Sequence, residues 1–488
     1  DGNLYVNFDQ EILQLIREAK CLDRMGVDIP ESAKIVLLQE EKFKSYYGDL
    51  HYLLKEYDRI MTRILPQTSD LLRPHGNDLE YKLRPGMVTL TWTSMNIDAY
   101  KHHFQNGLQK LEELVINMND IIDNRIEKNL RTISKMQLVD LPSETIELEV
   151  FVKMQEKHVM NQAGVLQGKN VEIETAVADI IRLAVSYPLD PHIEPINEST
   201  KQAVKAYYNR TMYRAMLTTT KSSLVSMKKR IKGGSGQLFS LAGQKPFFEL
   251  HIELAVPNVS VDPSLQDVQK AISKASKAVL TIAKGVYDWD QDGIPMKERV
   301  TFFESITKDI EIVRTVLLLT GSMQGLKNDV KRYLDQFYKY EWLWKDDMAL
   351  AYKSFLSKKP TIDDYENCLK RFENVDAEVK AQASIMVIGA LRLTTKGIKY
   401  NLAQEASAWK IQFSGNLKKT AQEQMSKIMG YIKSTVSKLN RKIEPKDLDG
   451  LRFLMDLLKE IRDRESSIEL EMSPVLDMYR MLSFFLPD

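Results

Sequence analysis

Apolar side chains recur at intervals of three and four through nearly the whole chain, and this helical periodicity is what most constrains the fold. The longest example is a seam of seven residues: Phe43, Tyr46, Leu50, Leu53, Tyr57, Ile60 and Ile64. Such a seam lies on one face of an α-helix and needs a second helix to cover it. We therefore expect a mainly α fold, an elongated series of helical bundles.

The seam is expected to lie on a helix between Pro30 and Pro66, and a second long helix is expected at about Ile97–Met136. We expect these two helices to pair antiparallel. Residues expected in their interface are Tyr46, Leu50, Leu53, Tyr57, Phe104, Leu108 and Leu111. Between the helices, Pro85-Gly86 is expected to break the backbone and lead into an extended strap, Val88–Thr93.

One run alternates with a period of two, which is the signature of a β-strand. Its apolar members are Phe248, Leu250, Ile252, Leu254 and Val256. A return along Val259–Val261 predicts one small hairpin. No sheet of four or more strands is expected, because the segments that follow, including 381–409, 416–440, 445–464 and 474–485, are predicted to be helical.

Breaks in periodicity divide the chain, which at 488 residues is longer than one core usually serves. Five segments are expected: a helical hairpin with its strap (1–140), a bundle with a basic helix (141–232), a loop, β element and helix (233–300), a bundle (301–412) and a last bundle (413–488). Tyr187–Pro195, with three prolines, is predicted to be a linker. Both ends read as cut, so we expect a piece of a larger protein.

No catalytic or cofactor motif is recognised, so no catalytic, cofactor-binding or metal-binding residue is predicted. A P-loop needs G-x-x-x-x-G-K-[ST], and neither Gly-Lys-Ser nor Gly-Lys-Thr occurs. Asp288–Gly293 matches the first half of a calcium loop, but Arg299 stands where the bidentate glutamate belongs, which favours a plain acidic turn. His102 and His103 are adjacent on a helix and point apart, so they do not form a chelating pair.

Aromatic residues cluster around Trp342 and Trp344, with Phe337 and Tyr340 close by in the sequence. Aromatic side chains mostly supply buried area. We interpret this cluster as bundle core rather than as a ligand cage.

Two basic blocks stand out in a chain whose net charge is only +1. Lys201–Lys232 holds nine Lys and Arg and no Asp or Glu, and Lys396–Lys446 holds eleven against three glutamates. Such blocks are typical of faces that meet an opposite charge. The candidate partner-binding residues are Lys201, Lys205, Arg210, Arg214, Lys221, Lys228, Lys229, Arg230, Lys232, Lys418, Lys419, Lys427, Lys433, Lys438 and Arg441. The open alternative is a solvated face balanced by acidic neighbours within the same fold.

The seam, then Leu-Leu-Arg-Pro at 71–74, then Pro-Gly and Leu-Thr-Trp-Thr-Ser at 85–94 opening a new helix, resembles the end of the N-terminal tail of dynein heavy chains. Among dynein heavy chains, the sequence resembles most the type found in axonemal outer arms. The resemblance is specific over about residues 5–130 and more diffuse through Phe247–Ser264 and Ser473–Tyr479.

This resemblance implies a structural and interaction segment that transmits force. The implied partners are other heavy-chain tails, intermediate and light chains, and docking proteins on doublet microtubules, in the cytoplasm, cytoskeleton and ciliary or flagellar axoneme. ATP and magnesium would belong to a motor ring outside these residues. That ring would make the parent chain an ATPase that walks toward microtubule minus ends and drives ciliary beating.

A different class of function remains open from the residues themselves. A stand-alone helical scaffold could bind nucleic acid or an anionic membrane through the basic blocks. No nucleic-acid motif accompanies the charge, and no apolar run is long enough to cross a bilayer. The resemblance accordingly predicts neither nucleic acid nor membrane as a partner.

Overall fold

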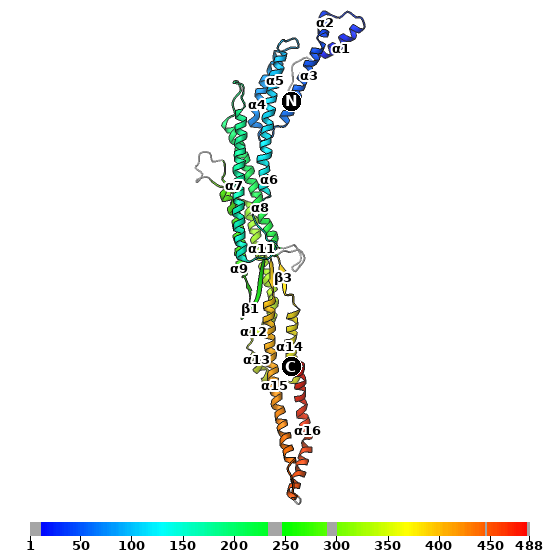
Figure 1. Cartoon of the computed structure of the whole chain (residues 1–488), viewed down its shortest axis with the longest axis vertical. Helices are drawn as coiled ribbons and strands as arrows, with labels where there is room; N and C mark the ends of the chain where they lie inside the picture. The colour runs from blue at the N-terminus through cyan, green and yellow to red at the C-terminus, as the bar shows by residue number, and fades with distance from the viewer. Residues whose placement is uncertain (1–10, 233–245, 290–299, 445–446, 486–488) are drawn as a thin grey trace. The chain divides into compact units, whose positions relative to one another are not determined.

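The computed structural model describes residues 11–232, 246–289, 300–444 and 447–485 (Figure 1). Helices account for 78% of these residues, which confirms the mainly α prediction. The chain divides into two compact units. Unit 1 comprises Asp1–Asp140, Met154–Ser226 and Ala275–Leu317, and unit 2 comprises Leu141–Lys153, Met227–Lys274 and Leu318–Asp488. The five segments expected from the sequence stay a prediction.

Unit 1 is built from helices. They are α1 (Glu11–Arg24), α2 (Glu31–Leu38), α3 (Glu40–Thr62), α4 (Ser69–Val88), α5 (Ile97–Ile121), the π-helical η1 (Ile122–Glu127), α6 (Lys128–Lys135), most of α7 (Leu148–Ser186) and α8 (Glu198–Lys232), the 3-10 turn η2 (Ile282–Gly285), α10 (Phe302–Lys308) and the start of α11 (Ile310–Asp335). The predicted linker is confirmed, since the chain between α7 and α8 is not helical.

Six of the seven residues of the predicted seam are buried on α3, and Ile64 lies just after the helix and is half-buried. The expected antiparallel pairing of α3 with α5 is wrong. Lys101 on α5 pairs with Asp49 on α3 at 2.7 Å, and the Asn119 amide, later on α5, donates to the Arg63 carbonyl just after α3 at 3.0 Å. The contacts advance together along both helices, so α3 and α5 run parallel. Helix α4, which was not expected from the sequence, returns the chain between them.

The expected break at Pro85-Gly86 is also wrong, because both residues lie in the last turns of α4. The Tyr100 hydroxyl on α5 donates to the Leu83 carbonyl at 3.2 Å, so the ring lies directly against this turn. A Cβ at position 86 would stand 2.2 Å from the Tyr100 hydroxyl oxygen. Glycine is therefore needed for the close approach of α5. The strap after it is non-helical, and its Trp92 is buried edge-on against Phe43.

Unit 2 combines a small sheet with helices. Its strands are β1 (Phe248–Ala255), β2 (Asn258–Asp262), β3 (Ile385–Ile388) and β4 (Leu391–Thr394); its helices are α9 (Leu265–Thr281, which ends in unit 1), the rest of α11, the 3-10 turn η3 (Gln336–Tyr340), α12 (Trp342–Lys345), α13 (Met348–Ser357), α14 (Ile362–Ala381), α15 (Lys396–Leu439) and α16 (Leu448–Phe485).

The predicted hairpin exists as β1 and β2, but it belongs to a four-stranded sheet, which contradicts the expectation of one isolated hairpin. The strand order is β2-β1-β4-β3, with β1 and β4 parallel and the outer pairs antiparallel. Segment 385–394 was expected to be helical and is the β3–β4 hairpin. Gly389 turns it with a φ of +55°, a conformation that glycine adopts without strain.

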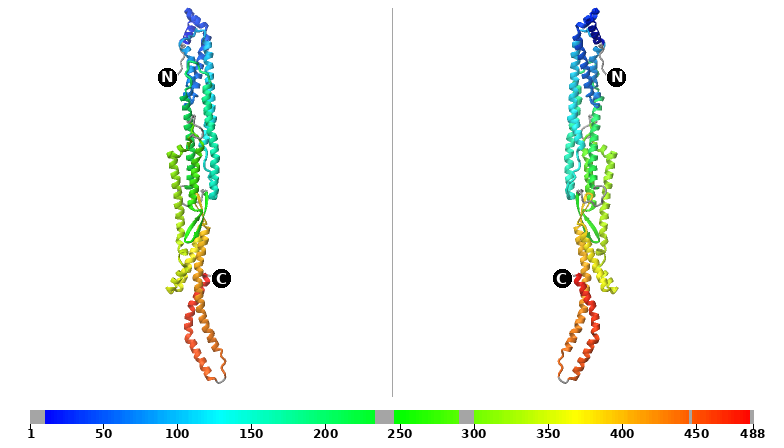
Figure 2. Two further views of the ribbon diagram at one scale, coloured as in Figure 1. Left: turned by 90° about the vertical axis from the view of Figure 1, so that its left-hand side faces the viewer. Right: turned by 90° about the vertical axis from the view of Figure 1, so that its right-hand side faces the viewer.

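The interior of the helical part of unit 2 is aromatic, as predicted for the tryptophan cluster. The ring centre of Trp342 lies 5.8 Å from that of Trp409 and 5.9 Å from that of Phe372. The Trp409 indole donates to the Leu343 carbonyl at 2.9 Å. These contacts join α12, α14 and α15 into one bundle. Helix α15 continues past this bundle and forms an antiparallel hairpin with α16, which lies beside it in both views of Figure 2.

Candidate partner-binding surfaces

The first basic block lies on α8, where several of its charges already have partners. Lys221 pairs with Glu311 of α11 at 2.5 Å, and Lys201 pairs with Glu198 at 3.1 Å. The Arg210 guanidinium donates to the Ala206 carbonyl on its own helix at 3.2 Å, and Lys205 also has an interaction partner. Arg214, Lys229 and Lys232 are exposed, and Lys228 is half-buried. This block is therefore partly balanced within the fold.

Arg230, a candidate on the same helix, is structural. Its guanidinium donates to the Pro142 carbonyl at 2.7 Å and lies 5.1 Å from the centre of the Phe247 ring. Burial lowers the pKa of this guanidinium, as expected for a charge taken out of water. Replacing Arg230 would disturb the packing beside the sheet, so this residue does not serve as a free contact.

Most of the second block lies on α15, which ends at Leu439, and the two ends of the block differ. Near the start of α15, the Lys399 ammonium donates to the Gln382 carbonyl at 2.6 Å, and Lys410 pairs with Glu373 at 2.7 Å. Further along, the six predicted residues are all exposed: Lys418, Lys419, Lys427, Lys433, Lys438 and Arg441. Within the described part of 411–476, none of the charged side chains lies in an ion pair. The unpaired cations of α15 are therefore the better candidate surface.

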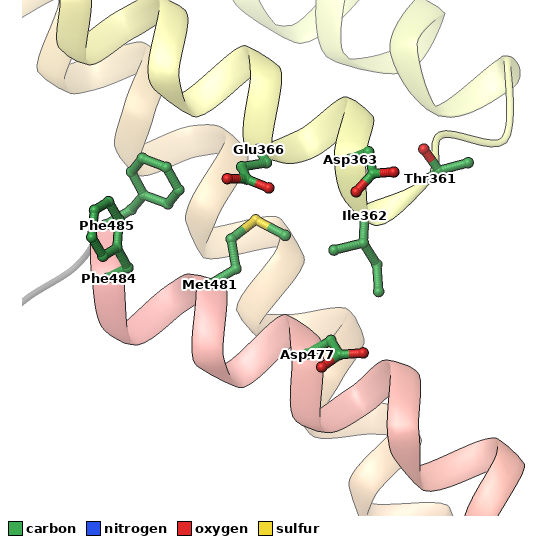
Figure 3. A pocket seen from close by; sticks show the side chains of 8 residues that line it. All are labelled: Thr361, Ile362, Asp363, Glu366, Asp477, Met481, Phe484 and Phe485. Atoms are coloured by element: carbon green, nitrogen blue, oxygen red, sulfur yellow. The ribbon is translucent and has the colours of Figure 1, made fainter.

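One open cleft lies in unit 2, between the start of α14 and the end of α16 (Figure 3). Its volume is about 670 Å³, and its lining includes Asp363, Glu366, Asp477 and Met481. Two of the carboxylates are already paired, since Glu366 binds Lys370 at 2.6 Å and Asp477 binds Arg480 at 3.4 Å. Thr361, also in the lining, donates its hydroxyl to Asp364 at 2.9 Å as part of the capping box that begins α14.

The other candidate motifs contribute no site in the described ranges. No group of three His, Cys, Asp or Glu able to hold a metal occurs among those residues, and His102 and His103 are exposed. Most of the calcium-like loop lies outside the described residues. Its first two positions are held by α7 and α8, since Asn209 donates to Asp288 and the Trp289 indole donates to Asn170 at 3.0 Å.

The fold and these surfaces define a class of protein: a mainly helical protein with a row of exposed cations without ion pairs, among the described residues, along α15. In the described ranges, no helix is long and apolar enough to span a membrane.

Residues 1–100 match the family model described as dynein heavy chain, N-terminal region 1. The chain is 39% identical over 487 residues to the dynein gamma chain of the flagellar outer arm of Chlamydomonas reinhardtii, covering 99% of this chain and 10% of that protein. It is 27% identical over 560 residues to dynein axonemal heavy chain 8 of Mus musculus, covering 99% of this chain and 12% of the relative. It is also 24% identical over 497 residues to the Chlamydomonas dynein-1-alpha heavy chain of the flagellar inner arm I1 complex, covering 97% of this chain and 10% of that protein.

The chain belongs to the dynein heavy chain family and corresponds to the N-terminal tail region of an axonemal member. It spans only about a tenth of the length of these curated relatives. Because both outer-arm and inner-arm dyneins match, the family places the chain in the cytoskeleton of the cilium or flagellum, at the axoneme. The alternative of a stand-alone nucleic-acid or membrane scaffold receives no support from these comparisons.

Proposed function

We propose that this chain is a force-transmitting scaffold and interaction segment of an axonemal dynein tail. In this proposal it helps to assemble the arm and anchor it to doublet microtubules. The parent chain is then the ATP-driven motor of ciliary beating, moving toward microtubule minus ends. The partners proposed are other heavy-chain tails, intermediate and light chains, and docking proteins.

One observation carries the assembly role: five exposed lysines of α15 and Arg441 just after it have no ion pair among the described residues. Exposed charge of one sign steers encounter and partner choice more than it adds affinity. An acidic surface on another subunit would neutralise it. The long helical bundles and the buried apolar seam on α3 support a mechanical role, because such packing resists bending.

The test is assembly in cells that build motile cilia. A full-length heavy chain carrying Lys→Glu at 418, 419, 427, 433 and 438 should associate more slowly with the other arm subunits and accumulate less in axonemes. The matched control carries Lys→Arg at the same positions, which keeps the charge. Equal incorporation of the two chains would contradict the proposal, and co-purification with nucleic acid in low salt would favour the alternative.

The segment itself is proposed to work without a nucleotide, because it lacks the P-loop motif. Titration of purified residues 1–488 with magnesium ATP in a calorimeter should give no binding heat. Stoichiometric binding would contradict this part of the proposal.

A further inference from the structure

Near the turn that joins them, α15 and α16 leave many of their apolar side chains exposed. We define the hairpin tip as the described residues 427–444 and 447–462. Its residues that are described and buried are Ile428, Thr435 and Leu457, whereas α3 alone buries six residues in unit 1. Helices are stabilised mainly by burying an apolar face against a neighbour. The tip therefore lacks part of the packing that such helices normally have.

The uncovered residues follow a helix-pairing pattern rather than scattering. On α16, Leu448, Leu451, Met455 and Leu458 are spaced by three, four and three, and are 74%, 53%, 63% and 48% exposed. In a heptad these are successive a and d positions, the positions that insert between the side chains of a facing helix. On α15, Met429, Ile432 and Val436 repeat the same spacing and are also exposed. A further helix would bury such a seam.

The charges beside the α16 seam indicate the chemistry of that helix. With Leu451 and Leu458 at d, the following e positions are Arg452 and Lys459, and in a heptad pairing the e and g charges select the partner. Neither residue has an ion pair among the described residues. Over the described residues of the tip, eight Lys and Arg stand against five Asp and Glu. An acidic partner is therefore favoured.

We propose that the hairpin tip docks an acidic amphipathic helix of another polypeptide, with apolar residues at its a and d positions and Asp or Glu facing Arg452 and Lys459. This inference rests on the proposed scaffold function and adds the place and chemistry of one contact. A second copy fits less well, because antiparallel self-pairing would set Arg452 and Lys459 against their own equivalents. An anionic membrane fits less well, because Asp449, Asp456 and Glu460 lie on the same tip.

The binding test uses the whole 488-residue chain and two labelled synthetic helices of about four heptads, long enough to hold helical structure. Both carry leucine at a and d; one has glutamate and the other lysine at e and g. Fluorescence anisotropy should show the acidic helix binding at least about tenfold more tightly. Equal binding of the two helices, or binding of neither, overturns the proposal.

Two variants localise the effect. Leu451→Gln with Met455→Gln should weaken binding of the acidic helix by about tenfold or more, since two apolar contacts are lost. The matched control is Ile310→Gln with Leu317→Gln on α11, which are 84% and 66% exposed and should leave binding unchanged. Arg452→Glu with Lys459→Glu should reverse the preference toward the basic helix. A loss of binding in the control as large as in the tip variant, or no reversal of preference, contradicts the proposal.

Two more measurements separate the possible failures. Vesicles of phosphatidylserine should not bind the chain. If they bind and the tip variant abolishes that binding, the tip binds a membrane and the helix proposal is wrong. A photo-crosslinker at Leu451 in the assembled arm should capture an acidic segment with apolar residues at a and d. If the arm assembles and Leu451 captures no protein, this inference fails while the scaffold proposal stands. If the chain is absent from the arm, the scaffold proposal itself fails.

Discussion

Gly389→Ala is expected to destabilise unit 2 through two effects that the structure separates. Gly389 turns the β3–β4 hairpin at a φ of +55°, which in an L-residue costs about 1–2 kcal/mol. A Cβ there would also stand 2.3 Å from the Ile231 carbonyl oxygen at the end of α8 and 2.9 Å from the Leu326 side chain. Overpacking of this kind costs about 1–3 kcal/mol. Together the two effects predict a decrease of about 2–5 kcal/mol in the free energy of unfolding.

Two glycines provide matched controls. Gly26 has a φ of +71° with nothing within 4 Å of the added Cβ, so Gly26→Ala should show the backbone cost alone, about 1–2 kcal/mol. Gly415 lies inside α15 with nothing within 4 Å, so Gly415→Ala should stabilise the chain by about 0.5–1 kcal/mol. Urea unfolding followed by tryptophan fluorescence and circular dichroism measures all three. A Gly389→Ala chain no less stable than Gly26→Ala would refute the close packing of α8 on the hairpin.

The remaining predictions concern unit 1. Leu53→Ala should lower the free energy of unfolding by about 2–5 kcal/mol in the same assay, since Leu53 is buried in the seam on α3. The control Leu38→Ala, at a side chain that is 87% exposed, should change it by less than about 0.5 kcal/mol. An equally small loss for Leu53→Ala would mean that the seam on α3 faces solvent. His75 is buried and its Nε2–H donates to the Ala184 carbonyl at 2.9 Å, and burial lowers its pKa below the usual value of about 6.5. The unfolded chain then takes up this proton first as the pH falls, so stability should decrease below about pH 6.5 and be constant in this respect above it. His75→Gln should flatten that slope, and an unchanged slope would contradict the assignment.

Helical periodicity predicted most of the fold because it reports directly which face of a helix is buried. The seam on α3, the basic helix α8 and the β1–β2 hairpin all follow from local pattern. The β3–β4 hairpin did not, because its apolar residues 385–394 suit a buried helix equally well until β4 pairs with β1, which lies far upstream.

Proline misled the reading of two helices. Pro85 and Pro474 were expected to end or begin elements, but they lie inside α4 and α16. A helix can continue through a proline because only one backbone hydrogen bond is removed, and packing can offset that loss. Without α4, the parallel arrangement of α3 and α5 could not be foreseen.

The candidate surface was foreseen in part. The sequence shows where cations gather, and the exposed residues of α15 match it. It does not show which cations find partners in the fold, so Lys221 and Arg230 on α8 could not be set apart from Lys418 and Lys433. The sequence predicted only a helix at 445–464; the exposed apolar pattern at 448–458 was not predicted, because its exposure depends on how α16 packs.

The most direct test of the central claim is a cryo-electron microscopy reconstruction of the axonemal arm that resolves side chains in this part of the tail. We expect the exposed cations of α15, from Lys418 to Lys438, and Arg441 just after the helix to lie against acidic residues of another polypeptide. A reconstruction in which this face of α15 is bounded only by solvent would contradict the assembly role proposed for the chain.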